Sequence, residues 1–105
     1  MGIRDLFKKS KEVDINKREE IKEKTRMQFN NREYDSALKS SENLIKYDPD
    51  YSFGYFYKAA CLVAFNKRDE AVTYCDKALK CDSSSNAKDL KEVIQRGDRF
   101  IGIRL

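Results

Sequence analysis

Histidine and tryptophan are absent from this 105-residue chain, which contains only one proline, four glycines and three cysteines. The absence of histidine removes the most common general base, the histidine-assisted nucleophile pairs and the most frequent metal ligand. The sequence also lacks a glycine-rich phosphate loop and a metal-binding constellation. We therefore expect no enzyme activity, no cofactor and no metal site. The scarcity of glycine and proline favours a helical protein over a β-sandwich or a disordered tail.

The cysteines are odd in number and lack CxxC spacing, which argues against a disulfide framework or a zinc site. Cys61, Cys75 and Cys81 each lie among apolar neighbours in a helical pattern. This pattern predicts buried, reduced thiols in a cytoplasmic protein. The sequence contains no apolar run of about 18 residues and no visible signal peptide, so we expect neither a membrane-spanning helix nor secretion.

Apolar side chains recur at helical spacing along most of the chain. The expected helices cover residues 17–31, 34–47, 51–65, 68–81 and 86–101, with a short amphipathic helix near residues 3–10. Asn16 and Asn86 each precede an acidic residue by three positions, a pattern typical of helix N-caps, and Asp50 can cap the helix after it. Pro49 ends the helix before it, because the residue before a proline is disfavoured in helical conformation.

Residues 18–51 can be aligned with residues 52–85, and each copy contains two of the expected helices. Five positions are identical: Lys24/Lys58, Asp35/Asp69, Ala37/Ala71, Lys46/Lys80 and Asp48/Asp82. Self-similarity at a period of 34 residues indicates a stacked repeat, in which each unit buries its apolar face against its neighbour.

The stretches "YDSALKSSENLIKYDPD" and "RDEAVTYCDKALKCDSS" carry a small residue, Ala37 or Ala71, where two helices must approach closely. With the Asp48-Pro49 turn, they resemble the tetratricopeptide repeat (TPR). The resemblance implies an all-α fold, a right-handed α-α superhelix of stacked helical hairpins. The resemblance covers the repeats 18–51 and 52–85, and the helix at 86–101 stands in the place of a capping helix. The expected domain spans residues 16–101. An amphipathic segment, 1–15, and an apolar tail, 102–105, flank this domain.

In this family, the first helices of successive repeats line a concave groove that holds a peptide. The resemblance therefore implies a non-catalytic protein–protein interaction module, an adaptor, scaffold or co-chaperone-like protein. We expect an aromatic floor between basic walls, which suits an acidic peptide or a chain terminus with an apolar anchor. The expected groove residues are Lys22, Arg26, Phe53, Phe56, Tyr57, Ala60, Val63, Lys88 and Lys91.

Other interpretations remain open at this point. The aromatic stripe can be core, covered by residues 1–15 or by the apolar tail "FIGIRL". The same tail can enter the groove of a second copy and produce a homo-oligomer. A nucleic-acid binder is a weaker interpretation, because the net charge is only +4 and acidic residues are interleaved with basic ones. So is a membrane-surface role, since residues 2–11 form only one short amphipathic segment.

Overall fold

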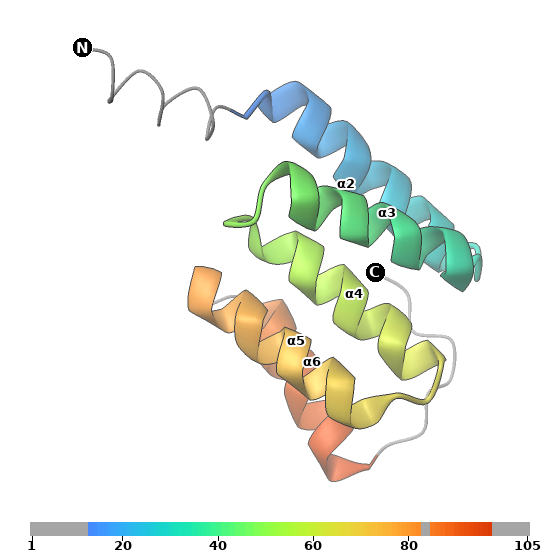
Figure 1. Ribbon diagram of the computed structural model, residues 1–105. Helices are drawn as coiled ribbons and strands as arrows, with labels where there is room; N and C mark the ends of the chain where they lie inside the picture. Colours follow the sequence, from blue (N-terminus) through green and yellow to red (C-terminus); the bar gives the residue numbers. More distant parts are fainter. Residues whose placement is uncertain (1–12, 83–84, 98–105) are drawn as a thin grey trace.

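The computed structural model describes residues 13–82 and 85–97, and all regular structure within these ranges is α-helical (Figure 1). The helices are α2 (Ile15–Asn30), α3 (Tyr34–Tyr47), α4 (Ser52–Ala64), α5 (Arg68–Cys81) and α6 (Ser85–Arg96). The all-α prediction is confirmed, and four of the expected helices agree with the observed ones to within two residues at each end. The segment near residues 3–10, residues 98–101 and the tail 102–105 lie outside the described residues.

Helix α4 is the centre of the molecule. It packs against α3 and α5, its neighbours in the sequence, and also against α2 and α6. Helices α3 and α5 do not contact each other within the described ranges. The contacts therefore place α2, α4 and α6 side by side, with α3 and α5 over them (Figure 1).

The 34-residue period of the sequence recurs in the backbone. Arg32 and Asn66 both adopt a left-handed conformation, with φ of 65° and 63°, after α2 and α4. At each turn the left-handed residue donates to the carbonyl three residues earlier, and the next residue donates to the carbonyl five residues earlier. These paired hydrogen bonds form a Schellman motif, which satisfies the last carbonyls of a helix. Each hairpin thus reverses direction by the same turn.

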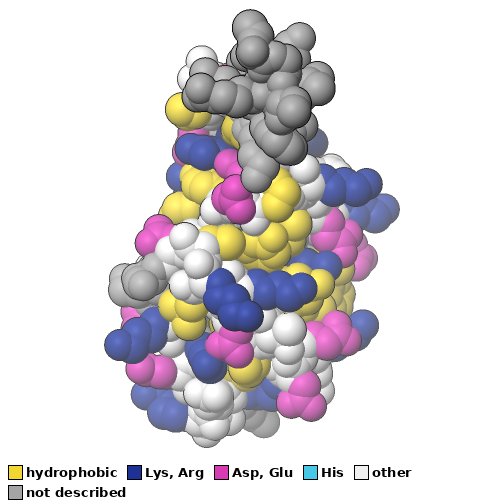
Figure 2. Space-filling view, turned by 60° about the vertical axis from the view of Figure 1, so that its left-hand side comes forward, with side chains coloured by type: hydrophobic (Ala, Val, Ile, Leu, Met, Phe, Trp, Pro, Cys, Tyr) yellow, Lys and Arg dark blue, Asp and Glu magenta, His cyan; other side chains and the backbone are white. Residues whose placement is uncertain are grey.

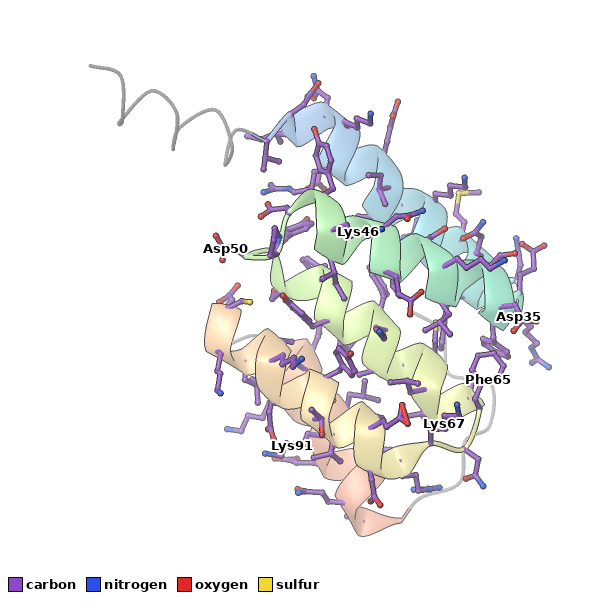
Figure 3. The ribbon with its side chains drawn as sticks, viewed as in Figure 1. Asp35, Lys46, Asp50, Phe65, Lys67 and Lys91 are labelled. Atoms are coloured by element: carbon purple, nitrogen blue, oxygen red, sulfur yellow. The ribbon has the colours of Figure 1, made fainter. Side chains whose placement is uncertain are left out.

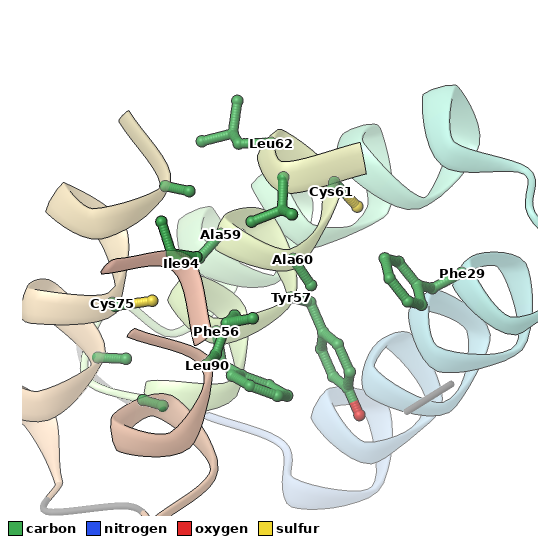
Figure 4. Close-up of a cluster of buried hydrophobic side chains, with 14 of the residues drawn as sticks. Phe29, Phe56, Tyr57, Ala59, Ala60, Cys61, Leu62, Cys75, Leu90 and Ile94 are labelled. Atoms are coloured by element: carbon green, nitrogen blue, oxygen red, sulfur yellow. The ribbon is translucent and has the colours of Figure 1, made fainter. Parts of the chain in front are cut away.

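The hydrophobic core follows α4 from end to end (Figure 4). Phe29 reaches it from α2, Cys75 from α5, and Leu90 and Ile94 from α6. Ala37 and Ala71 are completely buried at the start of α3 and α5, as the sequence predicts for sites of close helix approach. Gly54 has a similar role, because a Cβ atom there would meet Ile45 Cγ1 at 2.9 Å.

The predicted helix caps differ from the observed ones. Helix α2 is capped by Asp14, whose Oδ1 accepts hydrogen bonds from the N–H groups of Asn16 and Lys17, so the prediction of Asn16 is wrong. Asn86 lies inside α6, and Asp50 donates its own N–H to Asp48 rather than capping α4.

Helix α6 ends at Arg96 rather than at 101, because Gly97 takes φ of 78° and leaves the helical conformation. None of the helices in the described part of the chain combines the length and apolarity needed to cross a bilayer. Figure 2 shows one face of the molecule, on which basic and acidic side chains are interspersed. This pattern is typical of helix surfaces in contact with water.

Candidate peptide-binding groove

A pocket of about 330 Å³ opens between α2, α4 and α6. Its lining residues are Lys22, Glu23 and Arg26 of α2, Phe53, Phe56 and Tyr57 of α4, and Asn86 of α6. Helices α2 and α4 are the first helices of the two hairpins, and α6 follows the second hairpin. Five of the nine residues expected from the sequence are brought together here.

The floor of the pocket is aromatic. The ring of Phe53 stacks on that of Tyr57, with centroids 5.9 Å apart, and meets the ring of Phe56 edge-on at 6.4 Å. Phe56 and Tyr57 are buried, whereas Phe53 is only half-buried. Burial raises the pKa of Tyr57 to about 12, in keeping with its enclosed position in the floor. Phe53 is thus the part of the floor most available to a ligand.

The predicted basic wall on α2 is present but is already paired. The Lys22 ammonium lies 2.9 Å from a carboxylate oxygen of Glu19 and 4.7 Å from the ring centroid of Phe53. The Arg26 guanidinium donates two hydrogen bonds to Glu23 Oε1, at 2.9 and 2.7 Å. A ligand carboxylate would have to compete with these two acidic side chains for both cations.

The other four expected residues lie elsewhere. Ala60 and Val63 are buried in the core and do not line the pocket. Lys88 is exposed on α6 but is not among the lining residues. Lys91 turns toward α5, where its ammonium lies 2.6 Å from Asp76 Oδ1. The structure therefore has no basic wall of Lys88 and Lys91 on the α6 side of this pocket.

Two lining residues, Glu23 and Asn86, were not expected. Glu23 had a signal in the sequence, since it is 34 residues before Tyr57, which was expected to face the groove. Asn86 was interpreted as a helix cap, whereas α6 begins one residue earlier and places Asn86 in its first turn. Together they make the rim of the pocket polar, and Glu23 offsets one of the two positive charges of Lys22 and Arg26.

A network of charged and aromatic side chains supports one end of the groove. Arg18 Nη1 donates to Asp48 Oδ2 at 3.1 Å, and its guanidinium lies 4.0 Å from the ring centroid of Tyr51. The Tyr51 hydroxyl donates to Glu19 Oε2 at 2.7 Å. This bond and the one from Lys22 lower the pKa of Glu19. Glu19 thus holds Lys22 over the pocket floor. Sequence spacing gave no signal for this network, because its members come from α2 and from the turn before α4.

The thiols differ in exposure. Cys61 and Cys75 are buried, whereas Cys81 is exposed, which corrects the prediction for that residue. Burial raises the pKa of Cys61 to about 12 and that of Cys75 to about 11. Within residues 13–82 and 85–97, no three His, Cys, Asp or Glu side chains converge in a group that could hold a metal ion.

Comparison with known proteins adds no assignment to these observations. No protein-family model matches the chain, and no curated protein matches it significantly.

Proposed function

We propose that this protein is a non-catalytic interaction module of the TPR type, which binds a peptide segment in the pocket between α2, α4 and α6. The observation that carries the proposal is the origin of the lining residues. All of them come from α2 and α4, the first helices of the two hairpins, and from α6, the helix that follows the second hairpin. Two features support the TPR type: the hairpins recur after 34 residues with the same turn, and small residues are buried at Ala37 and Ala71.

The ligand that fits this pocket is a peptide with an apolar or aromatic anchor. Phe53 is the partly exposed ring of the floor, and a ligand that displaces Lys22 from it gains an aromatic contact. Such contacts give much binding energy for little loss of conformational entropy. The volume of the pocket is near the lower end of the range for ligand pockets, so the pocket can hold a side chain but not a folded element. Lys22, Glu23, Arg26 and Asn86 at the rim can exchange hydrogen bonds with the peptide backbone. Because Lys22 and Arg26 are paired, the proposal rests on the apolar anchor and not on an acidic ligand.

A pair of tryptophan substitutions on α6 tests this function. Short random peptides are selected for binding to the full chain, and the affinity of the selected peptides is measured by fluorescence anisotropy. Asn86→Trp places an indole at the pocket and should weaken binding by at least about tenfold. Gln95→Trp is the matched control, because Gln95 is exposed on the same helix outside the pocket lining. Equal affinity of the two variants for every selected peptide would refute the proposal.

A further inference from the structure

A second surface lies around α3, away from the groove. Two neighbouring pockets form it, one of about 460 Å³ and one of about 420 Å³. The first is lined by Ile21, Lys24, Ser40, Asn43, Lys46 and Tyr47. The second is lined by Glu42, Asn43, Ile45, Lys46, Tyr55, Lys58, Tyr74 and Lys77. Because the pockets share Asn43 and Lys46, they form one continuous surface. We call it the lysine surface, after Lys24, Lys46, Lys58 and Lys77 (Figure 3 labels Lys46 on α3).

The charge of the lysine surface is not balanced. Glu42 is the single carboxylate among the residues that line either pocket, and the Lys58 ammonium lies 3.1 Å from it. No ion pair is formed by Lys24, Lys46 or Lys77 with any other residue in the described ranges. The groove between α2, α4 and α6 is different, since both of its cations, Lys22 and Arg26, have carboxylate partners. Net positive charge in a concave surface attracts anionic partners.

Two of the three aromatic rings that line the lysine surface, those of Tyr47 and Tyr74, already have an ammonium group over them. Tyr74 stacks almost parallel on Tyr55, with centroids 6.4 Å apart, and the ammonium groups of Lys58 and Lys77 lie 4.5 and 4.7 Å from its ring centroid. Lys17 lies over the ring of Tyr47 at 5.7 Å. Binding of single-stranded nucleic acid relies on open aromatic rings on which bases stack. This arrangement therefore favours a different polyanion.

Each pocket has one aliphatic side chain in its lining, and this bears on which class of anionic partner the surface fits. Ile21 lines the first pocket, and Ile45 lines the second. Concave pockets with apolar walls accept individual side chains, whereas a bilayer surface is met by apolar groups that project from a helix. An anionic chain that also carries apolar side chains matches both the charge and the shape.

We propose that the lysine surface binds an acidic peptide segment of a partner protein. The carboxylates of this peptide segment contact Lys24, Lys46 and Lys77, and its apolar side chains enter the two pockets beside α3. This surface is separate from the groove, so the molecule has two docking sites of different chemistry: one for an apolar anchor and one for an acidic segment. Binding at the lysine surface weakens as salt is added, because exposed ion pairs are screened.

The test uses a synthetic peptide in which glutamate and aspartate flank two leucines, titrated into the ¹⁵N-labelled full chain at low ionic strength. The double variant Lys46→Glu/Lys77→Glu should weaken its binding by about tenfold or more. The double variant Lys39→Glu/Lys80→Glu is the matched control. It changes the net charge equally on the same two helices, at exposed lysines outside both pockets. Its affinity should stay within about twofold of the parent.

Any of three outcomes would overturn the inference. The first is that the amide signals of α3 and α5 do not shift when the peptide is added, and the second is that the two double variants lose affinity equally. The third is that an oligothymidine or an anionic vesicle binds the same residues more tightly than the peptide does. Failure here leaves the groove proposal intact, because Asn86→Trp does not alter the lysine surface. Failure of the groove likewise leaves the lysine surface intact.

Discussion

The hairpin of α2 and α3 and the hairpin of α4 and α5 have similar backbones, but the first helix of each lies in a different environment. Their second helices have the same length and end at residues 34 positions apart. The fully buried positions also correspond, with Thr25 matching Ala59 and Ser41 matching Cys75. The hairpins differ in how far the remaining face of the first helix is exposed. Met27 of α2 is 57% exposed, whereas its equivalent in α4, Cys61, is fully buried.

The difference comes from the neighbours of each helix. Helix α4 is enclosed by α2, α3, α5 and α6, whereas α2 contacts only α3 and α4 within the described residues. The sequence of α2 is adapted to this position, since it is polar on most of its circumference and buries only Thr25 and Phe29 completely. A repeated backbone therefore permits different surface chemistry in each copy. In this molecule the groove is formed where the polar helix α2 faces the apolar helix α4.

The largest effect should come from placing the same charge at the two equivalent positions. Cys61→Asp buries an unpaired carboxylate and should lower the free energy of unfolding by about 3 kcal/mol or more. Met27→Asp, on the exposed equivalent, should change it by no more than about 0.5 kcal/mol. Urea unfolding followed by circular dichroism measures both. Cys61→Ala separates the loss of volume from the buried charge. Similar losses for the two aspartate variants would show that the hairpins do not differ in enclosure.

A smaller effect is expected at the turns, where the hairpins are alike in geometry but not in residue type. Arg32 and Asn66 both occupy the left-handed conformation, which asparagine tolerates better than arginine does. Arg32→Gly should therefore raise the free energy of unfolding by about 0.5–1 kcal/mol, after allowing for the greater freedom of glycine in the unfolded chain. Asn66→Gly should change it by only a few tenths of a kcal/mol. Thermal unfolding of the two variants gives the comparison. A larger gain at Asn66 would contradict this account of the turns.

The helices and the hairpin period could be predicted from the sequence, because both depend on local spacing. Apolar periodicity and the position of Pro49 fix where α3 ends, and the repeated alanines mark the close contacts. The charge balance of the groove could not be predicted in the same way. Lys22 and Arg26 line the pocket beside the aromatic floor, but their pairing with Glu19 and Glu23 depends on side-chain rotamers. The lysine surface was missed because its residues come from four helices.

The smallest effect concerns the network around Glu19, to which the second hairpin has no equivalent, since Phe53 occupies the corresponding position. The hydrogen bond from Tyr51, followed by that from Lys22, lowers the pKa of Glu19 in the folded state. A lowered pKa stabilises the fold above the unfolded-state value of about 4.3, and this contribution is lost as pH falls through the folded-state value.

Glu19→Gln should therefore be slightly less stable than the parent at neutral pH, and the difference should shrink on acidification below about pH 4.3. Chemical unfolding measured across this pH range detects the change. Glu20→Gln is the matched control, because it removes a carboxylate from an exposed neighbouring position on α2. A constant separation between parent and Glu19→Gln down to the most acidic pH at which both fold would show that the carboxylate charge contributes nothing. The network would then hold Lys22 over the groove through hydrogen-bond geometry alone.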